Sequence, residues 1–478
     1  MEGKGGFLRR HADTWIALGL LACFALSRFI AVRQGLVFNF DILDFGYQFL
    51  DPALLKHDLS RSLWFLHSQP PGFNLFLGVI LKLAPGTGRT LFAWAFRLMG
   101  VLLVPSLFFL QRRLGVPRAV AAGATLLVVL SPAALLYENW LFYTYPVALL
   151  LVVAALCFAR FAEQGKALDG FALFAALAAL VYLRSIFHPV WFLALVALAA
   201  WSRGRGEWRR TALLALGPFV LVLALFGKNL VLFGEFTSST WLGMSASKMT
   251  TTGLTDEEWA RLRAEPGYPA ILDIETFESV ARYEPFLPPH QARGIPALDT
   301  IDKTTGYTIE ERFIPFFNLN HAQVIDAAHL YGDAAKWVFA REPMGYWRSV
   351  NLALIVFFKP ASEYLFLAQT PGDIRGYEKA YNLIVHGKIG RHTYINDEGR
   401  VEYGDRRNDW ANIGFLLPPL VLLPILYGFW LFCGIVRRRR AATPADHAIL
   451  FLAANITWRG SRCLGSFWKW ARTIASAT

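Results

Sequence analysis

The sequence predicts an all-α polytopic membrane protein, and its composition and its pattern of apolar runs carry that prediction. Hydrophobic residues make up 55% of the 478-residue chain and charged residues only 17%, against about 25% charged residues in typical soluble domains. The apolar residues gather into long runs, and short basic clusters separate many of those runs. Long apolar runs of this kind are typical of helices that cross a membrane.

The apolar runs define the expected spans. They cover residues 14–33, 70–85, 91–110, 119–137, 141–159, 168–183, 187–201, 210–232 and 411–436, with a short last run at 446–456. No small-residue cleavage site follows the basic N-terminus, which predicts an anchored first span rather than a removed signal peptide. Counting every long run except 70–85 gives about eight spans and a partial one near the C-terminus.

The runs also divide the chain into parts. We expect an N-terminal transmembrane module over 1–232, an outer soluble domain over 233–410, a transmembrane helix over 411–436 and a basic tail over 437–478. The region 233–410 is polar and mixed, and it is long enough for a soluble domain of its own. No further span follows about residue 458, and we expect this end of the chain either to be truncated or, because it is basic and aromatic, to lie on the membrane surface.

The basic clusters predict the orientation, because Lys and Arg are enriched in cytoplasmic loops. The clusters are Lys4/Arg9/Arg10, Arg112/Arg113/Arg118, Arg160/Lys166, Arg203/Arg205/Arg209/Arg210 and the four arginines at 437–440. All of them face the cytoplasm only if segment 70–85 does not cross the membrane. That segment would form about 22 Å of helix, short of the roughly 30 Å bilayer core.

We therefore predict that 70–85 is an interfacial helix on the outer face. Its double proline suits a first helical turn. The first outer loop then covers 34–90, and the mixed residues between Asp51 and Trp64 predict a second interfacial helix within it.

Several function classes are disfavoured. The formal charge of +12 lies in short clusters between apolar runs, which does not indicate nucleic-acid binding. The four cysteines show no CxxC spacing, so neither a zinc site nor a disulfide framework is indicated. The chain also lacks the GxxxxGK[ST], GxGxxG and HExxH patterns of nucleotide and zinc enzymes.

Three acids lie where the predicted topology places the outer face. Asp41 and Asp44 closely follow the first span, and Glu138 lies where one apolar run ends and the next begins. Each aspartate is either a loop residue or helix cap, or a general base at the membrane surface. Glu138 is either an interface residue or part of a site.

Cations and polar groups are expected on the same face. Arg184 and His188 lie between two short runs, Lys228 lies late in a run, and His67 and Gln69 precede the double proline. They fit either a basic and aromatic interface belt or a site that binds phosphate oxygens. Acids beside cations at a membrane surface suit transfer from a lipid-linked phosphate, with the cations holding the leaving phosphate and an acid activating a hydroxyl.

Three stretches carry a resemblance to a known family. They are FDILDFG after the first span, HSQPPGFNLFLGVILKL in the first outer loop, and KNLVLFGEF at the end of a later span. In order and spacing they resemble the GT-C membrane glycosyltransferases, in particular the bacterial relatives of the protein O-mannosyltransferases and of the lipid A aminoarabinose transferase. The resemblance covers about the first 240 residues. The region 233–410 is longer and less recognisable than in that family, and relatives usually continue with more spans.

The resemblance implies an inverting transferase that uses a polyprenyl-phosphate sugar on the outer face of a bacterial plasma membrane. Its acceptor would be a hydroxyl of a glycan, lipid or protein. The matched catalytic acid is Asp41, with Asp44 as the alternative, and Glu138 falls near a second acidic position.

The resemblance also assigns groups to the donor. His67 and Gln69 occupy the region before the PP motif where relatives place a polar or basic residue, and Lys228 replaces a late-span arginine that contacts lipid phosphate. Lysine lacks the bidentate fork of arginine. Some relatives need a divalent ion and others do not. Asp41, Asp44 and Glu138 could supply oxygen ligands, but the sequence requires no metal.

Two other function classes stay open. The chain could be a non-enzymatic membrane protein such as a lipid or anion transporter, or an oligosaccharide ligase or polymerase. Transporters often contain internal repeats and helices broken deep within spans. The sequence shows no repeat and its polar residues crowd at one surface, which favours the enzyme.

Overall fold

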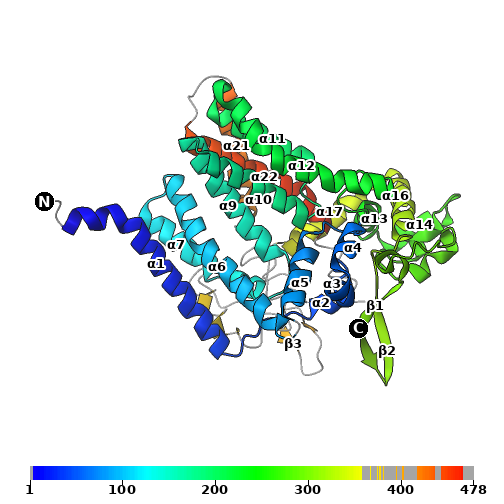
Figure 1. Ribbon diagram of the computed structural model, residues 1–478. Helices are drawn as coiled ribbons and strands as arrows, with labels where there is room; N and C mark the ends of the chain where they lie inside the picture. The colour runs from blue at the N-terminus through cyan, green and yellow to red at the C-terminus, as the bar shows by residue number, and fades with distance from the viewer. Residues whose placement is uncertain are drawn as a thin grey trace.

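The computed structural model describes residues 4–84, 86–357, 417–436 and 443–466, with a few short stretches between 367 and 402. This part of the chain is mostly helical, with two small two-stranded sheets, β1–β2 and β3–β4 (Figure 1). The predicted regions 233–410, 411–436 and 437–478 therefore lie partly outside the described residues.

Four described helices are long and apolar enough to cross a membrane. They are α1 (Lys4–Arg33), α6 (Gly88–Arg113), α9 (Thr144–Gln164) and α12 (Trp208–Phe233). A bent pair, α7 (Arg118–Val129) and α8 (Pro132–Glu138), makes a fifth candidate if it is one span. The predicted helical membrane protein is confirmed at this level, and the chain has the character of an integral membrane protein.

The predicted run 119–137 does not form one straight helix. It is bent by 55° between α7 and α8, because Ser131 starts a new helix by accepting a hydrogen bond from the Ala134 amide, and Pro132 follows it. Shorter apolar helices complete the bundle. They are α10 (Ala167–Leu183), α11 (Pro189–Arg203) and the described apolar part of α21 (Leu417–Val436).

Helices α9 to α12 share an apolar core with α22 (Pro444–Ser466). The ring of Phe451 in α22 stacks on Phe158 in α9 at 4.5 Å between centroids. The sequence predicted a basic tail over 437–478 with a partial span near the C-terminus, and the structure contains a helix there that packs into the bundle. The short apolar run 446–456 supplies the face that makes this contact.

The first outer loop is built from short helices. They are α2 (Ile42–Phe45), α3 (Pro52–His57), α4 (Leu59–Trp64) and α5 (Gly72–Leu83). The predicted single helix between Asp51 and Trp64 is thus two short helices, divided at Asp58. Helix α5 has 12 residues, or about 18 Å, which agrees in length with a helix that does not cross the membrane. Its Gly78 packs directly on the side chain of Leu59.

The part of the chain predicted to lie outside the membrane, called the outer region here, follows α12. Its regular elements are α13 (Leu242–Thr251), α14 (Asp256–Ala264), α15 (Pro296–Asp299), β1 (Asp302–Ile309), β2 (Arg312–Phe317), α16 (Val324–Arg341), α17 (Pro343–Phe357), and the short strands β3 (Tyr394–Ile395) and β4 (Val401–Glu402). Three single-turn 3₁₀ helices lie between α14 and α15, at Ala270–Asp273, Val280–Arg282 and Glu284–Phe286, and a fourth, Arg205–Glu207, precedes α12. Helices α13 and α16 pack closely through small residues, with Gly243 against Ala328 and Gly332. The β1–β2 hairpin projects away from the helices (Figure 1).

Candidate functional site

Asp41 is exposed and begins the single turn α2. The residues before it pair with the chain after α8. The Asn39 amide donates to the Asn139 carbonyl at 2.7 Å, and the Leu141 amide donates to the Asn39 carbonyl at 2.9 Å. The Asn39 side chain in turn accepts from the Asp41 amide at 3.0 Å. The structure therefore fixes Asp41 beside the segment 139–143, which leads into α9.

Asp44 lies one turn further and is half-buried. Burial raises the pKa of its carboxyl, while the nearby Lys303 ammonium acts in the opposite direction. Lys303 comes from β1 and is only 4% exposed. Its Nζ donates to the Gly46 carbonyl at 2.8 Å, and burial lowers its pKa to about 8. A cation from the outer region is thus enclosed beneath the turn that carries both aspartates.

Asp51 ties the same hairpin to the first outer loop. One carboxylate oxygen caps α3 by accepting from the Ala53 amide at 2.8 Å, and it also accepts from the Thr304 hydroxyl at 2.7 Å. The other oxygen accepts from the Thr304 amide at 2.5 Å. Sequence reasoning missed Asp51 and Lys303 as site-building residues, because no local pattern links them.

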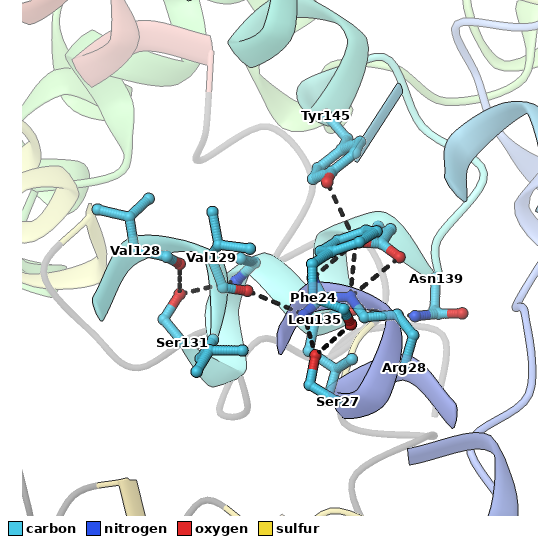
Figure 2. Close-up of polar contacts among 12 residues, drawn as sticks. Phe24, Ser27, Arg28, Val128, Val129, Ser131, Leu135, Asn139 and Tyr145 are labelled. Carbon is cyan, nitrogen blue, oxygen red and sulfur yellow. Dashed lines mark hydrogen bonds and ion pairs between the residues drawn. The ribbon is translucent and has the colours of Figure 1, made fainter. Parts of the chain in front are cut away.

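Glu138 is not exposed beside the two aspartates. It is 1% exposed and pairs with Arg28 of α1 at 2.6 Å. The Tyr145 hydroxyl donates to the same carboxylate at 3.1 Å (Figure 2). The structure thus makes Glu138 the counter-ion of a buried arginine. Arg28 was missed by sequence reasoning, although an arginine inside the apolar run 14–33 is itself a signal.

Arg28 also meets the break between α7 and α8. Its Nη1 donates to the Val129 carbonyl at 2.9 Å, and the Ser131 hydroxyl donates to the Val128 carbonyl at 2.7 Å (Figure 2). The break removes the backbone donor four residues further on for both carbonyls, although the Ser131 amide still donates to Val128 at 3.2 Å, and such a loss is costly in an apolar environment. Side chains satisfy both of them.

Two tyrosines from the outer part of the chain complete this arrangement. The Tyr381 hydroxyl donates to the Leu127 carbonyl at 2.7 Å, and the Tyr377 hydroxyl donates to the Leu130 carbonyl. Each of the four carbonyls from 127 to 130 is therefore hydrogen-bonded to a protein side chain. The break is a built feature of the fold rather than a frayed helix end.

The predicted cations Arg184 and His188 lie where α10 ends and α11 begins. The Arg184 guanidinium lies over the Tyr143 ring, 4.8 Å from its centroid. His188 caps α11, because its Nδ1 accepts from the Val190 amide at 3.3 Å. Arg184 therefore lies next to the segment 139–143 that also holds Asp41.

Lys228 and His67 meet at the end of α12. The Lys228 Nζ donates to the Leu66 carbonyl at 2.7 Å. The His67 ring is fully buried, with Nε2 at 3.0 Å from the Asn320 carbonyl and Nδ1 at 2.8 Å from the Thr240 hydroxyl. A carbonyl only accepts, so Nε2 carries the proton.

Burial also lowers the pKa of His67 to about 3. The structure differs from the prediction here, since a neutral, enclosed ring has no charge to offer a phosphate. Gln69, two residues on, is half-buried in the same turn.

His67 should make the fold sensitive to acid. The unfolded ring binds a proton below pH 6.5, whereas the folded ring stays neutral down to about 3. The unfolded state therefore takes up more protons in this window, and the free energy of unfolding should fall by up to roughly 5 kcal/mol as the pH drops through it. Thermal unfolding in detergent at several pH values measures this loss.

His67→Gln keeps a donor and an acceptor but does not titrate, so it should flatten the pH dependence. The change should be partial, because burial also lowers the pKa of His321 to about 4. His329→Gln, at an exposed histidine paired with Glu235, serves as the control. A pH dependence that is identical in His67→Gln and the wild type would refute this account.

An apolar cavity of about 320 Å³ lies between α5, α6, α9 and α10. It is lined by Gly72, Phe73, Phe76, Met99, Pro146, Leu149, Leu150, Ala179, Tyr182 and Leu183. The Phe73 ring meets Tyr143 edge-on at 5.7 Å, and Arg184 lies over that same tyrosine. A guanidinium thus lies next to an apolar cavity within the bundle.

Among the residues that the structure describes, no group of three His, Cys, Asp or Glu side chains could hold a metal ion. Comparison of the chain with protein-family models, with curated proteins and with solved structures found no match.

Proposed function

We propose that this protein is an inverting glycosyltransferase of the GT-C type. It moves a sugar from a polyprenyl-phosphate donor to an acceptor hydroxyl on the non-cytoplasmic face of a bacterial plasma membrane. The observation that carries the proposal is the position of Arg184. Its guanidinium lies beside an apolar cavity and over the ring of Tyr143. Tyr143 belongs to the segment 139–143, which pairs with the chain directly before Asp41.

The donor's two chemical parts match this arrangement. An isoprenoid chain is apolar, and so is the lining of the cavity. The volume of the cavity lies near the lower end of the roughly 300–1,000 Å³ that is usual for ligand pockets. The cavity therefore suits only the part of the isoprenoid chain next to the phosphate. A guanidinium binds two phosphate oxygens at once through its forked N–H groups, so we assign binding of the donor phosphate to Arg184. Lys228 and His188 lie near the end of α10 that precedes Arg184, because the His188 ring, four residues after Arg184, meets Phe226 of α12 at 5.3 Å between centroids. With Gln69 they are the further candidates for the phosphate.

The reaction is a single displacement at the anomeric carbon. The acceptor oxygen forms a bond to that carbon while its proton passes to the Asp41 carboxylate, or to Asp44 in the alternative assignment. The bond between the carbon and the phosphate oxygen breaks, and polyprenyl phosphate leaves with the bonding electrons. Arg184 stabilises the charge that develops on the leaving phosphate.

The proposal includes about eight spans around this site. They are α1, α6, the bent pair α7–α8, α9, α10, α11, α12 and α21. Helices α10 and α11, with 17 and 15 residues, would be short spans of about 25 and 22 Å. Short spans at this point would bring the outer surface close to Arg184.

The broken α7–α8 helix is the one observation that favours the transporter instead, because transporters expose broken backbone to their cargo. Here the carbonyls at the break are hydrogen-bonded to Arg28, Ser131, Tyr377 and Tyr381. This leaves the break poorly suited to bind a solute, and we therefore prefer the enzyme.

The test is turnover of a panel of polyprenyl-phosphate sugars by the purified protein in lipid nanodiscs, followed as release of polyprenyl phosphate. The wild type should release it, and Arg184→Ala should raise the donor KM by about 10- to 100-fold, as expected for losing hydrogen bonds to a charged group. Arg282→Ala, at an exposed arginine of the outer region, is the matched control.

Two results would count against the proposal. Wild-type protein that releases no polyprenyl phosphate from any donor, yet moves the intact lipid between leaflets of a vesicle, would establish the transporter. An unchanged donor KM in Arg184→Ala would remove Arg184 from the donor site.

A further inference from the structure

One guanidinium of α1 joins two consecutive helices, α7 and α8, that lie 101 and 110 residues further along the chain. Arg28 of α1 donates through Nε and Nη2 to the Glu138 carboxylate, at 3.0 and 2.6 Å, and through Nη1 to the Val129 carbonyl at 2.9 Å. Val129 ends α7 and Glu138 ends α8. Arg28 therefore holds the last residue of α7, directly before the break, and the last residue of α8 at once (Figure 2).

The segment that follows Glu138 is hydrogen-bonded to the residues directly before Asp41. Glu138 precedes Asn139, whose carbonyl accepts from the Asn39 amide, and Leu141 donates back to Asn39. Asn39 then holds the Asp41 amide with its own side chain. A continuous series of bonds thus runs from Arg28 to the turn that carries the proposed base.

The pair is enclosed, with side-chain exposures of 7% for Arg28 and 1% for Glu138. Water has little access to replace either partner, so the paired geometry is strongly favoured over any open arrangement. The Tyr145 hydroxyl occupies a further acceptor position of Glu138. Contacts from α1 and from α9 thereby fix the position of Glu138. They also fix the start of the segment 139–141 that follows it.

We propose that Arg28 is a positioning residue for the transfer reaction, acting through Glu138 and the segment 139–141 to place Asp41. Arg28 does not contact the substrate. This inference rests on the proposed function, because it takes Asp41 to be the group that accepts the proton in the transfer reaction. It predicts that the aspartate turn loses its position when the pair is removed, even if the bundle stays folded.

The experiment uses the double variant Arg28→Gln/Glu138→Gln, which removes the pair without leaving one buried charge unpaired. Hydrogen exchange followed by mass spectrometry reports on the amides of Asn39 and Leu141, and kinetics report on transfer. We expect faster exchange at both amides, a kcat about 10²-fold lower and a donor KM within about threefold of wild type. Arg33→Gln, at an exposed arginine on the same helix, should match the wild type.

Each outcome decides the inference. Wild-type exchange in the double variant, or faster exchange with an unchanged kcat, would overturn it. If the double variant does not fold, Arg28→Lys gives the same readouts, because one ammonium cannot occupy the positions of three guanidinium nitrogens. If wild-type protein transfers no sugar, the proposed function fails, and exchange at Asn39 and Leu141 still shows whether the pair holds the turn.

Discussion

Replacing Asp41 by asparagine is expected to lower kcat for sugar transfer by about 10²- to 10⁴-fold, the range for losing a general base. The donor KM should stay within about threefold of wild type, because Arg184 and the apolar cavity are unchanged. The turn itself should survive the change, since Asn39 holds the backbone amide of residue 41 rather than its carboxylate. Steady-state release of polyprenyl phosphate, measured over a range of donor concentrations, separates the two constants.

Asp44→Asn is the matched comparison, since it lies one turn away above Lys303 and is half-buried. It should reduce kcat much less than Asp41→Asn. Asp333→Asn, at an exposed and remote carboxylate of α16, controls for the loss of an acid. Loss of activity in Asp44→Asn with full activity in Asp41→Asn would transfer the role of base to Asp44.

Gly243→Ala is expected to disrupt the outer region more than any single loss of a surface contact. A Cβ at residue 243 would lie 1.8 Å from the Ala328 carbonyl oxygen and 2.8 Å from the Gly332 nitrogen. Both are backbone atoms of α16, so α13 and α16 must move apart. We expect a loss of about 3 kcal/mol or more, at the upper end for overpacked sites. Thermal unfolding in detergent measures the change.

Gly123→Ala is the control for this prediction. Gly123 is exposed in α7, and a Cβ there would meet no heavy atom within 4 Å. Alanine favours a helix over glycine by about 1 kcal/mol, so this variant should be neutral or more stable. Equal unfolding temperatures for Gly243→Ala and Gly123→Ala would show that the α13–α16 contact does not limit stability.

The class of this protein can be read from its sequence. The runs 14–33, 91–110 and 210–232 lie within α1, α6 and α12, and run 141–159 covers most of α9. The shortness of run 70–85 agrees with the 12-residue α5. Helices of this kind depend on the hydropathy of consecutive residues, which can be read along the chain. Even so, the run 119–137 did not reveal its break at Ser131, and the last run gave no sign that α22 packs on α9.

The roles of the polar residues depend on tertiary contacts. Glu138 looked like Asp41 in the sequence, but Arg28, 110 residues away, makes it a buried counter-ion. His67 looked like a cation, but Thr240 and Asn320 enclose a neutral ring, and Lys303 reaches Gly46 from 257 residues away. The physical reason is that the charge and role of an ionisable side chain depend on burial and on its partners in space. Those partners come from distant parts of the chain and leave no local pattern.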